Sequence, residues 1–403
     1  MKILVINCGS SSCKFQLFDM DTGVVLAKGN ADRIGIDGKL SYKNSKGADL
    51  EKEVELPDHK VAVNVVLSQL TDPETGVISD VSEISAVGHR VLHGGKYYSE
   101  SVVVNEDVKR VIRECFPLGP LHNPANLTGI EACESVLPAG TPQVAVFDTA
   151  FHMTMPPKAY TYALPYEISE KYSIRRYGFH GTSHRYVSHR VAELMGRDIK
   201  DLKIVTCHIG NGASVAAIKD GKVIDTSMGL TPLAGVMMGS RSGDIDPSAV
   251  TYLMQKTGMQ PQEMADFLNK KSGVLGITGI SSDMREIESA AAEGNERARL
   301  ALDMYNYRIK KYIGAYAAAM GGLDVIVWTA GVGENQVGTR LDACSGLEFL
   351  GVKMDAEANN CRGKEKLISA PDSKVQVWVV PTDEEIVIAR DTMELVLENR
   401  RKS

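Results

Sequence analysis

Residues 3–19, ILVINCGSSSCKFQLFD, share their pattern with residues 204–220, IVTCHIGNGASVAAIKD. In both stretches an apolar strand enters a turn of small residues, and a second strand leaves toward an aspartate and a glycine. An ungapped alignment places Asn7 opposite His208, Gly9 opposite Gly210, and Asp19 opposite Asp220. Two such hairpins predict two related half-molecules. Each turn can point backbone N–H groups into a shared cleft, and a ring of such donors suits a polyphosphate.

The composition is that of a soluble globular protein. The 403 residues exceed one ordinary core, so two domains are expected, and 43% hydrophobic and 24% charged residues are typical of this class. The formal net charge of −6 argues against a nucleic-acid partner but leaves anionic small substrates open. No apolar run reaches the ~18 residues of a membrane-spanning helix. We see no signal peptide before the first strand and expect no membrane partner.

The cysteines predict a reducing compartment. The chain has 7 cysteines, and none of them forms a Cys-x-x-Cys pair. Neither a zinc site nor a disulfide framework is therefore expected. Scattered free thiols are typical of a cytoplasmic protein.

The order of predicted elements repeats, because strands come first in each half and helices follow. Residues 151–157, FHMTMPP, interrupt the pattern and mark the predicted boundary. Residues 295–320 form the longest predicted helix, which ends at the glycine pair 321–322. Near the C-terminus, Thr382 and Glu385 predict a capping box at the start of the last, amphipathic helix.

The first small-residue turn, from Asn7 to Lys14, is not a Walker A loop. That motif needs a second glycine and a Ser or Thr after the lysine, and it opens a helix. Here the alternation of Phe15 and Leu17 predicts an outgoing strand. Three serines and a lysine can bind phosphate oxygens, and the Asn7 amide can ligate a metal. The alternative is a plain polar hairpin, but the duplication favours a functional one.

Two arginines lie in glycine-rich segments. Arg90, in GHRVLHGG at 88–95, follows an apolar strand, where burial is costly without an anionic partner. An internal carboxylate or a substrate anion can fill that role. Arg241, in MGSRSGDIDP at 238–247, is the only large side chain of a tight loop. It suits a guanidinium that forks onto phosphate or carboxylate oxygens, and the alternative is a solvated surface turn.

A third segment, YGFHGTSH at 177–184, places His180 between glycines. His180 can donate a hydrogen bond to a transferring phosphoryl group, and Phe179 can form an apolar wall beside it. A single histidine is more often structural. We assign that structural role to His59, His152, His184 and His189.

Three further segments have both a structural and a nucleotide-binding interpretation. GVGEN at 331–335 lacks the third glycine of a dinucleotide fingerprint but can admit a flat base or ribose. SSDMR at 281–285 predicts a helix N-cap, and Asp283 and Arg285 can also face a nucleotide. Glu384 either complements the dipole of the last helix or holds Mg²⁺ together with Asn7.

Taken together, these segments resemble the acetate kinase (acetokinase) family over essentially the whole chain. The matching segments, in order, are Asn7–Lys14, Gly88–Gly95, Tyr177–Ser183, His208–Gly212, Gly239–Gly243, Gly331–Asn335 and Thr382–Glu385. The wider superfamily contains sugar kinases, Hsp70-type ATPases and actin. The resemblance implies an α/β fold with two duplicated RNase H-like (actin-type ATPase) βββαβαβα domains that flank a nucleotide cleft. The implied domains are residues 1–150 plus 384–403, and residues 151–383.

The resemblance also implies roles for individual residues. Asn7 and Glu384 would place Mg²⁺ or Mn²⁺. Arg90 would bind the carboxylate substrate, and His180 and Arg241 would stabilise the transition state. Two more residues match active-site positions of the family, the catalytic aspartate Asp148 and the histidine His122. The implied ATP/ADP-binding residues are Ser10, Ser12, Lys14, His208, Ile209, Gly210, Asn211, Gly212, Asp283, Met284, Arg285, Gly331, Val332, Gly333, Glu334 and Asn335.

The acyl pocket of the family resembles Leu92, Leu121, Phe179 and Pro232 here. Position 92 is often valine in relatives, so the extra methylene of leucine should tighten the pocket. That disfavours longer acids without excluding propionate, since one methylene is worth only ~1–3 kcal/mol in a pocket.

The implied reaction is reversible phosphoryl transfer from ATP to acetate, which gives ADP and acetyl phosphate. A carboxylate is already ionised at neutral pH, so no general base is required. We therefore expect Asp148 to orient Arg241 or a Mg²⁺-bound water. The alternatives are a propionate kinase, a sugar kinase, and a non-enzymatic ATPase module of the actin and Hsp70 type. The resemblance further implies a homodimer, and closure is expected about hinges near residues 150 and 383.

Overall fold

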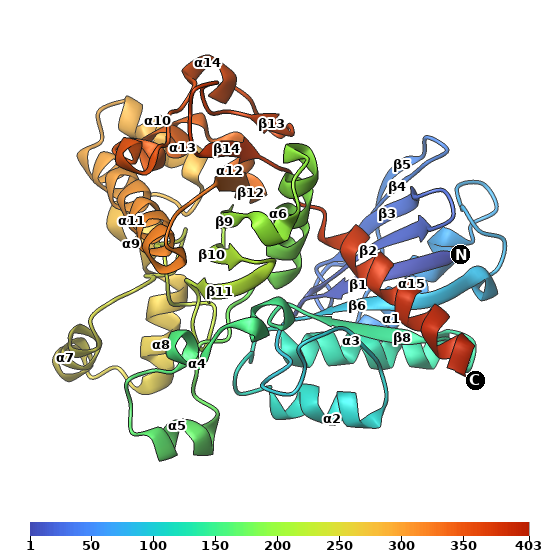
Figure 1. Cartoon of the computed structure of the whole chain (residues 1–403). Helices are drawn as coiled ribbons and strands as arrows, with labels where there is room; N and C mark the ends of the chain where they lie inside the picture. The colour runs from blue at the N-terminus through green and yellow to red at the C-terminus, as the bar shows by residue number, and fades with distance from the viewer. Residues whose placement is uncertain (403) are drawn as a thin grey trace. The chain divides into compact units, whose positions relative to one another are not determined.

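The computed structural model describes residues 1–402, without the side chain of Lys402. The chain divides into two compact units (Figure 1). Unit 1 consists of residues 1–150 and the segment that begins at Asp383, and unit 2 consists of residues 151–382. Each unit is built around its own sheet and is described by itself.

Unit 1 contains a mixed sheet with the strand order β5-β4-β3-β2-β1-β6-β8-β7. β1 is antiparallel to β2 and parallel to β6, and β6 is parallel to β8. The bounds are β1 Lys2–Cys8, β2 Ser12–Asp19, β3 Val24–Asp32, β4 Lys39–Asn44, β5 Asp49–Glu53, β6 Ile84–Val91, β7 Val102–Val103 and β8 Gln143–Phe147.

Helices cover both faces of this sheet. Leu4, Ile6 and Leu17 face a core that includes Val63 and Val66 of the first helix. On the other face the C-terminal helix α15, drawn in red in Figure 1, lies along β1, β6 and β8. The helices are α1 His59–Leu70, α2 Glu106–Glu114, α3 Asn123–Val136 and α15 Glu384–Lys402, with 3-10 turns η1 Val81–Glu83 and η2 Ala150–Thr154, whose last residues belong to unit 2.

Unit 2 contains a second mixed sheet with the strand order β11-β10-β9-β12-β14-β13. β9 is antiparallel to β10 and parallel to β12, and β12 is parallel to β14. The bounds are β9 Lys203–Ile209, β10 Ala213–Lys219, β11 Lys222–Thr226, β12 Val325–Thr329, β13 Lys366–Leu367 and β14 Gln376–Val379.

The long helix of unit 2, α11 Glu296–Met320, begins after Asn295, whose side chain accepts from the Ala298 N–H, and ends at the left-handed Gly321. The predicted helix and its glycine stop are therefore confirmed. The other helices of the unit are α4 Pro157–Tyr160, α5 Tyr166–Tyr172, α6 Gly181–Met195, α7 Pro247–Thr257, α8 Pro261–Lys270, α9 Gly273–Thr278, α10 Met284–Ala292, α12 Ala330–Asn335, α13 Val337–Cys344 and α14 Ala356–Asn359, with 3-10 turns η3 Ile199–Asp201 and η4 Glu348–Leu350.

The two sheets share one topology. The order β3-β2-β1-β6-β8 in unit 1 corresponds to β11-β10-β9-β12-β14 in unit 2, with the same antiparallel and parallel pairings. The related half-molecules predicted from the two hairpins are therefore present.

One detail of the predicted duplication is wrong. Lys2 pairs with Asp19 in unit 1, whereas the equivalent Lys203 pairs with Lys219. The second hairpin is one residue shorter, so Asp19 corresponds to Lys219 and not to Asp220. Asp220 lies instead in the next turn, where it and Gly221 both have positive φ (55° and 72°). That conformation fits a two-residue turn between antiparallel strands.

The predicted cap of the last helix is also displaced. Asp383 Oδ1 accepts the Ile386 N–H at 3.0 Å, so Asp383 caps α15. The Thr382 hydroxyl bonds to Ser183 instead. An aspartate at this position competes well with a threonine one residue earlier, because both are strong capping residues.

All 7 cysteines are buried free thiols, which agrees with the predicted absence of a disulfide framework. Within residues 1–402, the helices are all too short or too polar to cross a lipid bilayer.

Candidate functional site

The first hairpin of unit 1 ends in a tight turn, where Gly9 donates its N–H to the Ser12 carbonyl at 2.8 Å. The carbonyl of Gly9 lies 2.8 Å from Nε2 of His59, the first residue of α1, so this helix anchors the turn. Ser10 is exposed and Ser12 is half-buried. The hairpin therefore presents its serines on a fixed backbone.

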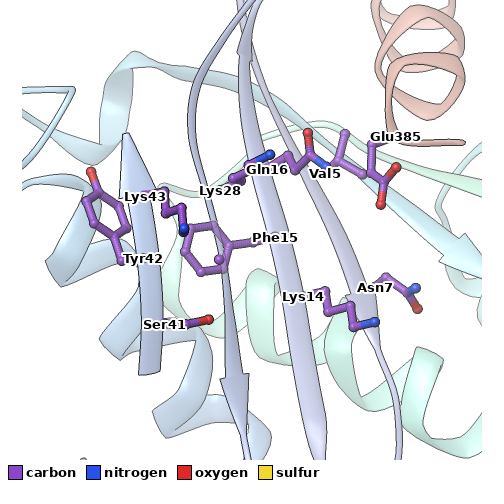
Figure 2. Close-up of a pocket in the computed structure, with 11 residues that line it drawn as sticks. Val5, Asn7, Lys14, Phe15, Gln16, Lys28, Ser41, Tyr42, Lys43 and Glu385 are labelled. Carbon is purple, nitrogen blue, oxygen red and sulfur yellow. The ribbon is translucent and has the colours of Figure 1, made fainter. Parts of the chain in front are cut away.

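Asn7 and Lys14 form a directly opposed pair on β1 and β2. Both line a cavity of about 250 Å³ that Glu385 of α15 also lines (Figure 2). Lys14 is exposed and Asn7 half-buried. An amide and an ammonium beside an open cavity can meet an anionic ligand or its counterion.

Arg90, at the end of β6, is held by carboxylates. Its Nε and Nη2 donate to Asp148 at 3.1 and 2.8 Å, and its Nη1 lies 3.7 Å from Glu384 Oε2. Burial alone would lower the pKa of Arg90, but Asp148 and Glu384 raise it above its ordinary value. Asp148 was expected to orient Arg241 or a Mg²⁺-bound water. Both oxygens of this buried carboxylate are bonded to Arg90, and the expected role of Asp148 stays a prediction.

Glu384 occupies the first turn of α15. Burial raises its pKa to about 7, with a smaller contribution from Asp148, while Arg90 opposes the shift. Its Oε1 is buried without a hydrogen-bond partner among the described residues. A buried carboxylate oxygen that lacks a donor fits a hard cation such as Mg²⁺, and the Asn7 amide oxygen is a ligand of the same kind.

Two asparagines of α3 fix the loop after β6. Asn126 Oδ1 accepts the Leu92 N–H at 3.0 Å, and its Nδ2 donates to the Cys8 carbonyl at 2.8 Å. Asn123 makes the equivalent pair with His93, accepting from its N–H and donating to its carbonyl at 3.0 Å. Asn126 therefore ties the first hairpin to the segment that carries Leu92.

The second hairpin, in unit 2, turns on a Gly210 N–H bond to the Gly212 carbonyl at 3.0 Å. A methyl group on Gly212 would lie 3.2 Å from His180 Nε2 and 3.5 Å from Arg241 Nη1. The His180 ring stacks on the His208 ring with centroids 4.1 Å apart. His180 itself has a left-handed backbone (φ 58°), which is strained for a residue other than glycine and places the ring at the start of α6.

Arg241 differs from Arg90 in its partners. Its Nη1 donates to the Pro232 carbonyl at 3.0 Å and lies 3.7 Å from the Met238 sulfur. Among the ion pairs of the described residues, none involves Arg241, and burial lowers its pKa. The guanidinium thus keeps a positive charge that no carboxylate of unit 2 offsets.

The loop that carries Arg241 is clamped to α9. Val274 and Leu275, in the first turn of that helix, donate their N–H groups to the carbonyls of Met238 and Gly239 at 3.0 and 2.9 Å. The first turn of a helix has N–H groups without intrahelical partners, which makes this arrangement favourable. Arg241 is therefore presented from a rigid support.

The predicted nucleotide segments of unit 2 lie against the second hairpin. A methyl group on Gly239 would meet Asn211 Oδ1 at 2.8 Å and the Ser282 carbonyl at 2.9 Å. One on Gly210 would meet the Ala330 Cβ at 3.5 Å. Asp283 caps α10 by accepting the Arg285 N–H at 2.9 Å, as predicted.

Residues 331–335 form α12 and not an open strand end. Glu334 Oε1 accepts the N–H groups of Ala330 at 2.8 Å and Thr382 at 3.2 Å. The carbonyl of Gly333 accepts from the buried Arg340 at 2.9 Å. The Glu334 carboxylate is thus occupied by backbone donors, whereas Gly331 is exposed at the first turn of the helix and Val332 and Asn335 are half-buried.

A sequence model of the Acetokinase family matches residues 2–390. The chain belongs to the acetokinase family. Acetate kinase of Phocaeicola vulgatus is 59% identical over 399 residues, which are 98% of this chain and 100% of the relative. The crystal structure of Porphyromonas gingivalis acetate kinase has a TM-score of 0.94 and 54% identity over 98% of this chain and 99% of that one.

A crystal structure of a propionate kinase from Francisella tularensis has a TM-score of 0.91 and 42% identity, over 98% of this chain and 99% of that one. Acetate kinases are therefore the better supported relatives. The predicted family, the actin-type ATPase fold and the enzyme class, a phosphotransferase with a carboxylate acceptor, are confirmed.

The four acyl-pocket residues predicted from the acetokinase resemblance differ in exposure. Leu92 and Phe179 are buried, Pro232 is half-buried, and Leu121 is 59% exposed. His122 is the N-cap of α3 and is exposed. Ile209 and Met284 are buried beside the hairpin turn and the α10 cap. The roles of these side chains stay predictions.

Sequence reasoning missed Asn123 and Asn126, which hold the backbone of the acetokinase hairpin and loop. His59 was assigned a structural role, and its contact with the Gly9 carbonyl agrees with that assignment. The asparagines carried one usable signal: they lie three residues apart in the first turns of a helix whose second residue is a proline. Asparagine is unfavourable within helices, so two of them on one face indicate side-chain bonds to backbone.

Proposed function

We propose that this protein catalyses the reversible transfer of the γ-phosphoryl group of ATP to acetate, which gives ADP and acetyl phosphate. Membership of the acetokinase family supports the proposal. The observation that carries it is the guanidinium of Arg241, which is presented beside the second phosphate hairpin without a carboxylate partner in unit 2. Such a charge is suited to a group that becomes more anionic as the reaction proceeds.

The chemical difficulty is electrostatic, because an anionic nucleophile must approach an anionic phosphoryl group. Acetate has a pKa near that of a protein carboxyl, ~4–5, so it needs no general base. In our proposal Arg90 binds the acetate carboxylate, while Arg241 and His180 stabilise the transferring group. Asp148 then acts by fixing the orientation of the Arg90 guanidinium through two hydrogen bonds, and not by moving a proton.

Mg²⁺ completes the proposed site. The unpartnered Glu384 Oε1 and the Asn7 amide would hold it, directly or through water. When bound, the cation neutralises phosphate charge and orients the phosphate chain. Lys14 and the serines of the first hairpin would contact the same phosphates.

The adenosine site is proposed on unit 2. The exposed glycine end of α12 and the α10 cap at Asp283–Arg285 both adjoin the hairpin of Gly210–Gly212. Backbone N–H groups of that hairpin would bind the phosphates. Glu334 supports this site through the backbone, since its carboxylate bonds to Ala330 and Thr382.

The acyl pocket is proposed at Leu92, Leu121, Phe179 and Pro232, with acetate preferred over propionate. His122 is proposed as a further active-site residue.

We also propose a cytoplasmic homodimer that closes about hinges near residues 150 and 383. Light scattering during size-exclusion chromatography tests the dimer.

The reaction is tested by trapping the product with hydroxylamine. Purified protein with ATP, Mg²⁺ and acetate should give acetohydroxamate, and omission of ATP should abolish it. Hydroxamate from propionate at a higher kcat/KM than from acetate would favour the propionate kinase. ATP hydrolysis without any hydroxamate would contradict the proposal and favour an ATPase module.

A further inference from the structure

We propose that a buried hydroxyl chain, Thr382–Ser183–His208, fixes the orientation and tautomer of the His208 ring. Ser183 and Thr382 would then be positioning residues for phosphoryl transfer. The inference rests on the proposed function, because it assigns His208 a hydrogen-bond donor role toward phosphate oxygens.

The chain is continuous and lies entirely within unit 2. Ser183 Oγ is 2.7 Å from His208 Nδ1 and 2.8 Å from Thr382 Oγ1. Ser183 is fully buried on α6, and His208 is buried at the end of β9. These residues are far apart in sequence, so the packing of α6 against β9 brings them together.

Thr382 is held at its backbone as well as at its hydroxyl. Its N–H donates to Glu334 Oε1 at 3.2 Å, and the same oxygen accepts the Ala330 N–H at 2.8 Å. Thr382 is the last residue of unit 2. The exit point of the chain from unit 2 is therefore tied, through Ser183, to the ring at the second phosphate hairpin.

The hydroxyl chain can run in two directions, and the proposed donor role of His208 requires one of them. When Thr382 donates to Ser183, and Ser183 donates to Nδ1, the His208 ring carries its proton on Nε2 and can donate it to an anion. The opposite direction places the proton on Nδ1 and makes Nε2 an acceptor, which would repel phosphate oxygens. Hydrogen-bond partners orient metal-ligating histidines in the same way, and their loss typically reduces metal affinity or activity about 10–100-fold, which sets the size of effect expected here.

Two further histidine rings lie close to His208. His180 stacks on it at 4.1 Å, and His184 lies with its ring centroid 6.1 Å away. His184 is bonded at Nδ1 to Thr206 and at Nε2 to Ser214, so hydroxyl groups also set its orientation. Hydroxyl groups therefore contact two of these three neighbouring rings, which is consistent with a positioning role for the Ser183 hydroxyl.

Steady-state kinetics of Thr382→Val and Ser183→Ala test the proposal. Valine keeps the shape of threonine but cannot donate, so kcat should fall about 10-fold while both KM values change less than about twofold. Ser183→Ala, which removes the direct partner of the ring, should lower kcat about 10–100-fold. Thr382→Ser should restore kcat. Thr251→Val, on the exposed face of α7, is the matched control and should leave kcat unchanged.

The nitrogen-15 spectrum of labelled histidine gives a readout that a loss of stability would not move. The wild-type protein should show His208 protonated at Nε2 only, with the signal assigned by its disappearance in His208→Gln. Thr382→Val and Ser183→Ala should show a mixture of tautomers in folded protein. A wild-type proton on Nδ1, or an unchanged tautomer and kcat in both variants, would overturn the proposal. Absence of acetyl phosphate formation by the wild type would instead refute the proposed function.

Discussion

Arg90 and Arg241 are both half-buried in glycine-rich segments, but their surroundings differ in charge. In unit 1, Asp148 and Glu384 surround Arg90 and raise its pKa. In unit 2, Arg241 contacts a carbonyl and a thioether, and burial lowers its pKa. The first arrangement holds a guanidinium in place, and the second leaves its charge available to a ligand. Similar sequence patterns thus place an arginine in two different electrostatic environments, which only the contacting groups distinguish.

The two hairpins repeat this contrast. The hairpin of unit 1 presents flexible polar side chains, Ser10 and Lys14, on a backbone anchored by His59 and Asn126. The hairpin of unit 2 presents glycines beside two stacked histidine rings. The same fold therefore places polar side chains at one hairpin, and glycine backbone and imidazole rings at the other.

The largest expected effect comes from Arg241→Gln. Removing the uncompensated charge should lower kcat about 10³-fold, since it deletes a stabiliser of the transition state. The melting temperature should change little, because the substitution removes no ionic partner from a carboxylate of unit 2. Arg241→Lys should recover only part of the activity, because lysine restores the charge but not the planar set of donors of a guanidinium. A kcat within fivefold of wild type in Arg241→Gln would contradict the role of Arg241 in stabilising the transition state.

Asp148→Asn should affect stability more than chemistry. It leaves Arg90 with Glu384 as its remaining ionic partner, and loss of one member of a buried pair costs about 3 kcal/mol of unfolding free energy. The KM for acetate should rise because Arg90 is less well held. The shape of the pH profile of kcat should not change, and a newly appearing pH dependence would assign Asp148 a proton-transfer role instead.

The pH dependence of unit 1 should depend on His89 of β6. Burial lowers its pKa from 6.5 to about 4, although Gln143 opposes the shift. As the pH falls, this histidine is therefore protonated in the unfolded chain before it is protonated in the folded chain. The contribution of neutral, buried His89 to stability is complete above pH 6.5 and is lost as the pH falls toward 4. At pH 5 the loss is about 2 kcal/mol.

Urea unfolding of wild type and His89→Gln at pH 7.5 and pH 5 measures this difference. Both tryptophans, Trp328 and Trp378, belong to unit 2, so their fluorescence follows that unit and circular dichroism reports on both. Equal pH dependence in the variant and the wild type would show that other groups are responsible.

The smallest expected effect concerns acid size. Leu92→Val removes one methylene from the proposed pocket, so the ratio of kcat/KM for propionate to that for acetate should rise about fivefold. Ile112→Val, a change of the same size in the core of unit 1, is the control and should leave the ratio unchanged. A ratio that does not move in Leu92→Val would place the acyl group elsewhere.

Local sequence patterns predicted the hairpins, the buried strands and the ends of α11, because these depend on neighbours along the chain. The same patterns misplaced Asp220, since an ungapped alignment cannot detect a turn shortened by one residue. They also misplaced the α15 cap, where Thr382 and Asp383 are both strong capping residues and the contact with Ser183 decides between them.

Long-range partners were out of reach of the sequence. Asp148 follows a buried strand, which predicts a carboxylate at a strand end, but nothing local identifies Arg90 as the residue it holds. Asn126 bonds to Cys8, 118 positions away, and Ser183 to Thr382, 199 positions away. Such contacts arise from the packing of helices on the two sheets and leave no periodic trace.

We propose that the charge of Arg241, which no carboxylate of unit 2 offsets, acts on the phosphoryl group during its transfer. Isothermal titration calorimetry tests this proposal. ADP is titrated into the wild type and into Arg241→Gln in the presence of Mg²⁺, acetate and aluminium fluoride, which is a planar mimic of the transferring group. We predict that the variant binds the fluoride complex at least about 100-fold more weakly while its affinity for ADP alone is unchanged. Equal affinity of both proteins for the fluoride complex would contradict the claim.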